Sequence, residues 1–167
     1  GQRIAFVGRR GDLPQVHIMR SAGGEAEKVT HHATSVSRLS WSADGTFVYF
    51  LAFEPKTAEQ EVREKVDDDV YPFDENYTHR HLWRISIADK VEERITKGDF
   101  SLLDYQLSRD GRRIVFHRAP TPLGGDAHKG EVWVMDATGE NAVQITKNSW
   151  PEAPSCCGGR GAQLSPD

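Results

Sequence analysis

Three short phrases recur along the chain in a fixed order, and their spacing restricts the fold more than any other feature. In each copy an apolar residue lies 14 residues before a threonine. The three pairs are Val16 and Thr30, Leu82 and Thr96, and Val132 and Thr146. A Ser-x-Asp turn follows each threonine, and the first two turns begin 12 residues after it, at Ser42 and Ser108. Unrelated segments would not share these distances, so the chain is built from an internal repeat.

Each copy has the pattern of four short strands. Apolar residues alternate with polar ones before the turn, as at Leu39 and Trp41, which is typical of a strand with one buried face. The Asp-Gly pair that ends at Gly45 favours a tight hairpin, because glycine accepts a positive φ. The β-branched and aromatic run Phe47–Phe50 supplies the returning strand. Repeated four-stranded sheets predict an all-β fold, a partial β-propeller of about three antiparallel blades.

We expect one partial propeller domain over residues 1–167. Its repeat units span residues 1–44, 45–110 and 111–167, and an insertion over residues 54–81 lengthens the second unit. Three blades do not close a ring, since propellers have about 4 to 8. Two explanations remain open. Either the chain is a segment of a larger protein, or two copies combine into one ring, with the strand near Gly161–Leu164 of one completing the first blade of the other.

The repeat also resembles a known family. Its succession of Ser-x-Asp-Gly, Ile-x-Phe, Leu-Trp and Ile-Thr is similar to TolB-like β-propeller repeats over essentially the whole chain. Such repeats form the N-terminal propeller of prolyl oligopeptidase-type serine peptidases, and the segment Asp74–Trp83 is similar to the acylaminoacyl-peptidase and dipeptidyl-aminopeptidase-like branch. The resemblance implies a non-catalytic propeller that caps the α/β-hydrolase domain of the same longer chain and gates the access of short peptides. The alternatives are a TolB-like propeller for protein–protein interaction and a self-assembling half-propeller scaffold.

No catalytic residue is expected within the chain itself. A Gly-x-Ser-x-Gly elbow, which would expose an activated serine on a strand–helix turn, does not occur in the sequence. The catalytic residues of a parent peptidase would therefore lie beyond Asp167. We expect no cofactor.

The insertion holds most of the chain's acidity. Nine acidic and four basic residues give it a net charge of −5, against +1 for the rest. Residues Thr57–Lys65 favour a helix. As an acidic arm over the propeller mouth, the insertion would attract the cationic amino terminus of a peptide. A solvated hairpin or a contact arm for an adjacent domain is the alternative. Candidate contacts with a peptide or partner are Asp67, Asp68, Asp69, Asp74, Glu75, Arg80 and Trp150.

Metal sites are not expected either. The acidic cluster of the insertion lacks the alternating ligands and mid-loop glycine of a calcium loop. His79 and His81 share one strand face but lack two further zinc ligands at a defined spacing. We expect these two histidines, with His31 and His32, to be ordinary surface or hairpin residues. The neighbours Cys156 and Cys157 give no disulfide framework.

Composition limits the partners. The net charge of −4 argues against a nucleic-acid surface. The longest apolar run, Phe47–Phe53, has seven residues, against about 20 for a membrane-spanning helix. The first 20 residues lack the pattern of a signal peptide, and the two cysteines do not indicate a cellular compartment.

Blade-to-blade packing accounts for Trp41, Trp83 and Trp133, which recur at strand positions of the repeat.

Overall fold

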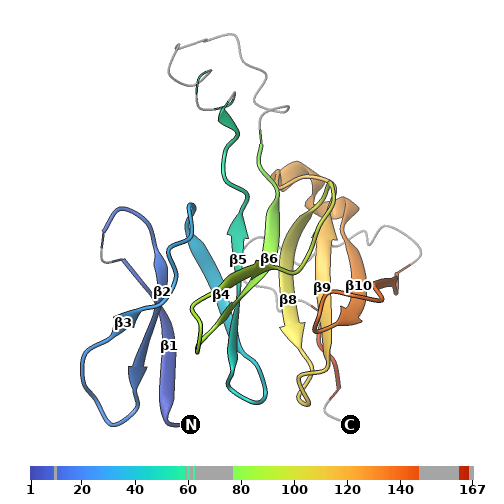
Figure 1. Ribbon diagram of the computed structural model, residues 1–167. Coiled ribbons are helices and arrows are strands. Elements are labelled where there is room, and N and C mark those ends of the chain that lie inside the picture. The colour runs from blue at the N-terminus through green and yellow to red at the C-terminus, as the bar shows by residue number, and fades with distance from the viewer. Residues whose placement is uncertain (10, 59, 61, 63–76, 147–161, 166–167) are drawn as a thin grey trace.

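The computed structural model describes residues 1–9, 11–58, 60, 62, 77–146 and 162–165. Within them, three antiparallel sheets stand side by side (Figure 1). The first sheet contains β1 (Arg3–Gly8), β2 (Gln15–Arg20) and β3 (Glu27–Lys28). The second contains β4 (Val36–Trp41), β5 (Phe47–Phe53), β6 (Arg80–Ser86) and β7 (Glu92–Arg94). The third contains β8 (Ser101–Leu107), β9 (Arg113–Ala119), β10 (Glu131–Asp136) and β11 (Val143–Gln144).

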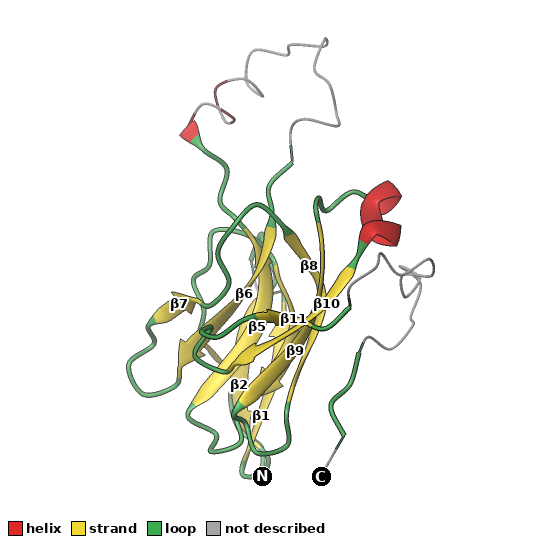
Figure 2. Cartoon of the chain, turned by 90° about the vertical axis from the view of Figure 1, so that its right-hand side faces the viewer, coloured by secondary structure: helices red, strands yellow, loops and turns green. Residues whose placement is uncertain are grey.

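In every sheet the strands follow one another in chain order, so each sheet is an up-and-down meander. The hairpin turns that join β4 to β5 and β8 to β9 lie at one end of the sheets, where the amino terminus also lies (Figure 1). The described ends of the insertion and the short 3-10 helix η2 (Gly124–Lys129) lie at the opposite end (Figures 1 and 2). Three adjacent antiparallel sheets with almost no helix confirm the predicted all-β, partial-propeller architecture.

The 14-residue spacing of the repeat has a structural cause. In the second sheet the Oγ1 atom of Thr96 accepts the backbone N–H of Leu82 at 3.0 Å, and the N–H of Ile95 donates to the Leu82 carbonyl at 2.8 Å. In the same way, the backbone N–H of Val16 donates to Thr30 Oγ1 at 2.8 Å and that of Val132 donates to Thr146 Oγ1 at 3.0 Å. The threonine therefore extends the pairing of a very short outer strand and satisfies an amide that would otherwise lack a partner.

The Ser-x-Asp-Gly turns form a repeated hydrogen-bond network. The hydroxyl of Ser42 donates to Asp44 Oδ1 at 2.6 Å, and the Thr46 N–H donates to the same oxygen at 3.0 Å. These bonds from Ser42 and Thr46 lower the pKa of Asp44 to about 2. Gly45 has a φ of 71°, which explains the glycine at this position. The turn at residues 108–111 repeats these features.

Two apolar clusters hold the sheets together. One lies between the first and second sheets and includes the fully buried Phe50 and Ile85, with Trp41 and Trp83 packed against it. The other lies between the second and third sheets, and Trp133 packs against it; its buried members include Leu82, Leu102, Ile114 and Phe116. The prediction that these tryptophans serve packing between blades is confirmed.

The strand expected near residues 161–164 is not formed in its described part. Residues 162–165 carry no strand pairing, although the backbone N–H of Leu164 donates to the side chain of Gln106 at 3.2 Å. The segment therefore lies beside β8 without extending a sheet.

Candidate functional site

The insertion leaves the second sheet through a group of polar side chains that we call the arm foot. It consists of Glu54, His79, Arg80, His81, Arg94, Thr96 and Ser101, which come from both ends of the insertion, from β7, from the connection to β8 and from the start of β8. The N–H of Glu54 donates to the carbonyl of His79 at 2.9 Å, so hydrogen bonding between the two chain segments continues beyond β5 and β6. The insertion therefore starts from a fixed base.

Arg94 is the centre of the arm foot because its guanidinium binds three groups. Its Nε donates to the Thr96 carbonyl at 2.7 Å, its Nη1 to Glu54 Oε1 at 2.5 Å and its Nη2 to His81 Nε2 at 2.7 Å. Since a guanidinium has no acceptor, the His81 ring presents its Nε2 lone pair and carries its proton on Nδ1. That Nδ1 lies 3.1 Å from Thr96 Oγ1, which completes the network.

His81 is held neutral by its surroundings. The side chain has no exposed surface, and burial together with the nearby charge of Arg94 lowers its pKa to about 3. A neutral imidazole between a guanidinium and a threonine hydroxyl is a structural link. We therefore assign His81 a role in fixing the insertion.

Arg80 fixes the insertion to the third sheet. Its Nε and Nη2 donate to the carbonyls of Leu102 and Leu103 at 2.6 and 2.7 Å. Its backbone N–H donates to Ser101 Oγ at 3.1 Å, and His79 Nδ1 lies 3.2 Å from the same oxygen. Ser101 is 1% exposed, so this Ser–His contact braces the arm foot and does not present a nucleophile to solvent.

The helix expected in the insertion begins with a capping box. The Thr57 N–H donates to Gln60 Oε1 at 2.8 Å, and the Gln60 N–H donates to Thr57 Oγ1 at 3.2 Å. Ala58, Gln60 and Val62 have helical backbone. The other predicted contact residues, Asp67, Asp68, Asp69, Asp74, Glu75 and Trp150, lie outside the described residues, as do Cys156 and Cys157. Their roles stay predictions.

The sequence predicts that the histidines are ordinary surface or hairpin residues, and the expectation of surface exposure is wrong for two of them. His81 is fully buried, and His32 is 8% exposed with its Nδ1 2.8 Å from Glu92 Oε2. His79 and His81 do lie on one face, with ring centroids 6.1 Å apart. Arg94 belongs to no motif in the sequence, so single motifs do not indicate its role. The repeat does indicate this region when its copies are compared. Gln15, His81 and Glu131 are equivalent polar residues. Each one immediately precedes the residue whose backbone N–H binds the repeat threonine.

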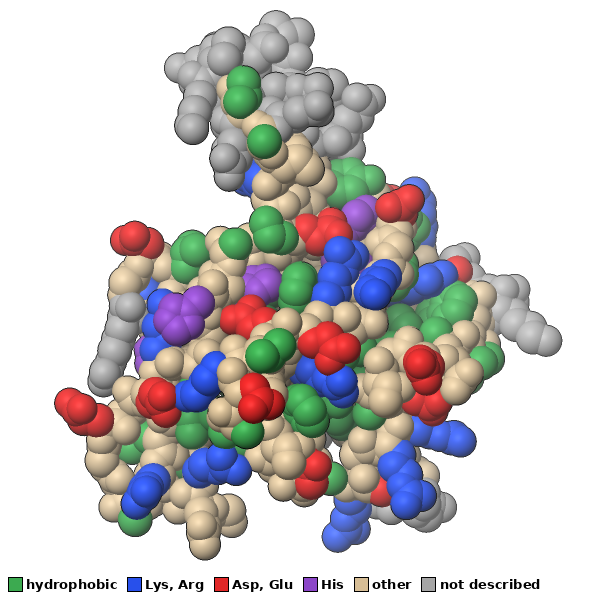
Figure 3. All heavy atoms as spheres, viewed as in Figure 1, with side chains coloured by type: hydrophobic (Ala, Val, Ile, Leu, Met, Phe, Trp, Pro, Cys, Tyr) green, Lys and Arg blue, Asp and Glu red, His purple; other side chains and the backbone are tan. Residues whose placement is uncertain are grey.

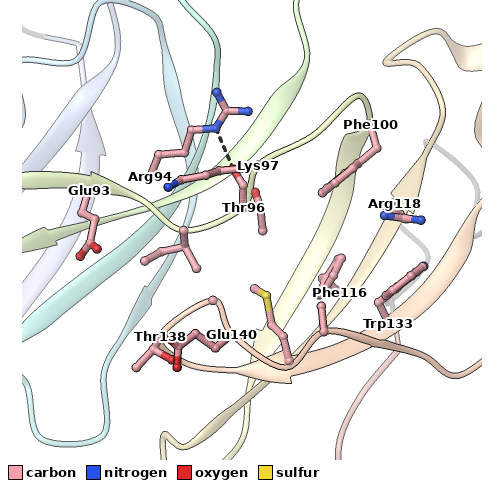
Figure 4. A pocket seen from close by; sticks show the side chains of 14 residues that line it. Glu93, Arg94, Thr96, Lys97, Phe100, Phe116, Arg118, Trp133, Thr138 and Glu140 are labelled. Atoms are coloured by element: carbon pink, nitrogen blue, oxygen red, sulfur yellow. Dashed lines mark hydrogen bonds between the residues drawn. The ribbon is translucent and has the colours of Figure 1, made fainter.

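A cavity of about 400 Å³ lies between the second and third sheets, directly beside the arm foot (Figure 4). Phe100, Phe116, Trp133 and Met135 form its apolar walls, and Lys97 stands at its edge. The walls also include Arg94 and Thr96 from the arm foot. A volume in this range, with aromatic walls and a few polar groups, is typical of small-molecule sites.

Glu131 holds two of the cavity walls in place. One of its oxygens accepts Trp133 Nε1 at 2.9 Å and Arg118 Nε and Nη2 at 3.1 and 3.0 Å. Partial burial opposes ionisation, but the hydrogen bonds from Trp133 and Arg118 outweigh it and lower the pKa of Glu131. The Arg118 guanidinium stacks 3.8 Å from the Trp133 ring centroid and 4.7 Å from that of Phe100. These side chains are therefore pre-organised.

The described residues were also compared with the patterns of metal sites and membrane-spanning helices. Among them, no group of three or more His, Cys, Asp and Glu side chains is arranged to hold a metal ion. No helix in the described part of the chain is both long and apolar enough to cross a membrane. Acidic and basic side chains are interspersed over the face shown in Figure 3 rather than gathered by sign.

Comparison with known proteins gives the fold a context. No protein-family model matches the chain. It is 29% identical over 150 residues to the uncharacterized peptidase YuxL of Bacillus subtilis, and the match covers 81% of this chain but 23% of that protein. The chain therefore spans less than a quarter of this curated relative.

Solved structures agree on the architecture. TolB from Acinetobacter baumannii matches with a TM-score of 0.57 and 16% identity, over 90% of this chain and 31% of that one. A prolyl endopeptidase matches with a TM-score of 0.58 and 15% identity, over 89% of this chain and 20% of that one. The β-propeller domain of the Trilobed protease from Pyrococcus furiosus matches with a TM-score of 0.53 and 11% identity, over 88% and 40% of the two chains. The chain therefore has a β-propeller-like fold, similar to the folds of TolB and of the propeller domain of a protease.

Proposed function

We propose that the chain is the non-catalytic propeller portion of a serine peptidase of the prolyl oligopeptidase type. The observation that carries the proposal is the 29% identity to a peptidase, together with the small share of that protein that the match covers. The unmatched remainder of such a protein is long enough for an α/β-hydrolase domain. That domain, in the same longer chain, is the proposed partner, and short peptides are the proposed substrates.

The arm foot supports a gating role for the insertion. Arg94 and Arg80 fasten its base to β6, to the Thr96 carbonyl and to the third sheet. The two described ends of the insertion, residues 54–58 and 77–81, lie at the end of the sheets opposite the amino terminus (Figure 1). These contacts fix the two described ends of the insertion, and a fixed base is suited to an element that narrows access to a site.

The test is to shorten the insertion in the full-length peptidase. Replacing residues 56–77 by Asn-Gly keeps the arm foot and closes β5 and β6 with a two-residue hairpin. The kcat/KM for a dipeptide anilide should stay within about twofold, whereas that for an unfolded peptide of about 30 residues should rise about tenfold or more. An unchanged ratio of the two constants would refute gating by the insertion.

A TolB-like interaction propeller is the second candidate, favoured by the structural match to TolB. It predicts a full-length protein without peptidase activity that binds a protein partner. A ring of two copies is the remaining arrangement, and it predicts a dimeric mass in solution.

A further inference from the structure

Two edge strands of neighbouring sheets, β4 and β8, carry a bulge at the same repeat position. The pairing of β4 with β5 shifts between Ser37 and Ser40, around Arg38, and the pairing of β8 with β9 shifts between Leu102 and Asp104. Arg38 and Asp104 each lie four positions before the repeat serine, so they are equivalent. A bulge re-aims the side chains beside it, and in propellers one edge of every blade lines a central channel. The bulges therefore place two charged side chains at one point of this edge.

Arg38 presents its guanidinium from an unusual backbone conformation. Its φ of 54° lies in the left-handed region, which residues other than glycine rarely adopt. The hydroxyl of Tyr105, on the neighbouring sheet, donates to the Arg38 carbonyl at 2.7 Å and anchors the bulge. The Arg38 side chain is 59% exposed, and its Nε lies 3.9 Å from Asp104 Oδ1, beyond hydrogen-bonding distance. Among the described residues no hydrogen bond engages this guanidinium, so its donors are available to a ligand.

A second guanidinium, that of Arg80, lies at the bulge of β8. Its Nε and Nη2 donate to the carbonyls of Leu102 and Leu103, which leaves Nη1 without a hydrogen bond among the described residues. Burial and the positive charge of Arg38 lower the pKa of Arg80, and the charge of Asp104 opposes them. Two guanidinium groups thus lie near the carboxylate of Asp104, which neutralises one of their two charges. The remaining positive charge favours an anion at this point.

We propose that Arg38 and Arg80 bind the carboxy-terminal carboxylate of a short peptide. The two guanidinium groups provide charge-assisted hydrogen bonds, from Arg38 and from Nη1 of Arg80. Phe53 is 37% exposed, and its ring centroid lies 5.9 Å from the Arg80 guanidinium carbon, so the ring offers an apolar contact to the last side chain of the peptide. Arg80 is also one of the residues that the sequence predicts to contact a peptide or partner. The choice of a peptide as the ligand rests on the proposed function, but binding at this site requires no hydrolase domain.

The experiment is a 1H–15N NMR titration of the 167-residue chain with the peptide N-acetyl-Ala-Ala-Phe as its free acid. We expect saturable shifts at the amides of residues 37–40 and 102–105 and at the Nε–H groups of Arg38 and Arg80. The carboxy-terminal amide of the same peptide, which lacks the negative charge, should bind about tenfold more weakly. The absence of a saturable shift up to about 10 mM, or equal affinity for the acid and the amide, would overturn the proposal. Either result is independent of peptidase activity, which is tested separately in the full-length protein.

Two variants and a matched control locate the site. Arg38→Gln removes an exposed cation and should weaken binding of the free acid about tenfold, with no change for the amide. Asp104→Asn keeps an oxygen for the Tyr105 N–H, which Asp104 Oδ1 accepts at 2.9 Å. It should tighten binding of the free acid about threefold, because it removes a competing negative charge. Arg112→Gln should change neither affinity, although Arg112 is also exposed and lies 4.0 Å from a carboxylate oxygen. If Arg38→Gln binds both peptides as Arg112→Gln does, or if Asp104→Asn weakens binding of the acid, the site is not at Arg38 and Arg80.

Discussion

Replacing Arg94 by methionine should lower the free energy of unfolding by about 2 to 4 kcal/mol. The change removes the partner of the fully buried His81 Nε2, of Glu54 and of the Thr96 carbonyl. Methionine keeps much of the aliphatic length of arginine, so the loss reports mainly on the polar groups left without partners. Urea unfolding at pH 7 measures the change.

Arg112→Met is the matched control. The Arg112 side chain is 86% exposed, and its nearest carboxylate oxygen, on Asp110, is 4.0 Å away. Its removal should change stability by less than about 0.5 kcal/mol. If Arg94→Met lowers the free energy of unfolding no more than Arg112→Met does, Arg94 does not organise the arm foot.

Acid should destabilise the chain through His81. Its folded-state pKa of about 3 lies below the ordinary value of 6.5, so the unfolded chain binds the proton more tightly. The stability that a neutral His81 contributes is complete above pH 6.5 and is lost as the pH falls towards 3. Between pH 7 and pH 4 this one group should account for about 3 kcal/mol of lost stability.

His81→Gln separates this effect from other acid-sensitive groups. Glutamine already occupies the equivalent repeat position at Gln15, where it binds Thr30 at 2.7 Å and the His32 carbonyl at 3.0 Å. The variant should therefore fold, and its stability should fall by about 3 kcal/mol less between pH 7 and pH 4. His31→Gln, on an exposed side chain, should keep the pH profile of the parent. Identical profiles for the parent and His81→Gln would show that His81 does not titrate as described.

The fold could be predicted from the sequence because the spacing of the repeat follows from hydrogen bonds between neighbouring strands. The 14-residue spacing between Leu82 and Thr96 corresponds to one side-chain hydrogen bond in each sheet. The Ser-x-Asp-Gly turn is equally local, since Asp44 binds only its near neighbours. Features formed within one repeat unit can be read from spacing and residue type.

The arm foot and the cavity depend on contacts between distant residues, and single motifs do not show them. Arg94 meets Glu54 across 40 residues, and nothing in the local pattern of either segment indicates the pairing. The burial of His81 likewise follows from the packing of neighbouring sheets.

The arm foot and the cavity are adjacent parts of one sheet junction. Arg94 and Thr96 belong to the first and line the second, and the ring of Phe100 lies 5.6 Å from that of His81 and 4.7 Å from the Arg118 guanidinium. The base of the insertion is therefore built into the packing between the second and third sheets. This connection gives a physical reason for placing the insertion in the second repeat unit.

The most direct test of the peptidase assignment is to react the full-length protein with a fluorophosphonate, which labels activated serines covalently. Peptide mapping should find one labelled serine, in a Gly-x-Ser-x-Gly elbow beyond residue 167, and none within residues 1–167. A folded full-length protein that takes up no label, or one labelled within this chain, would contradict the assignment of a non-catalytic peptidase propeller.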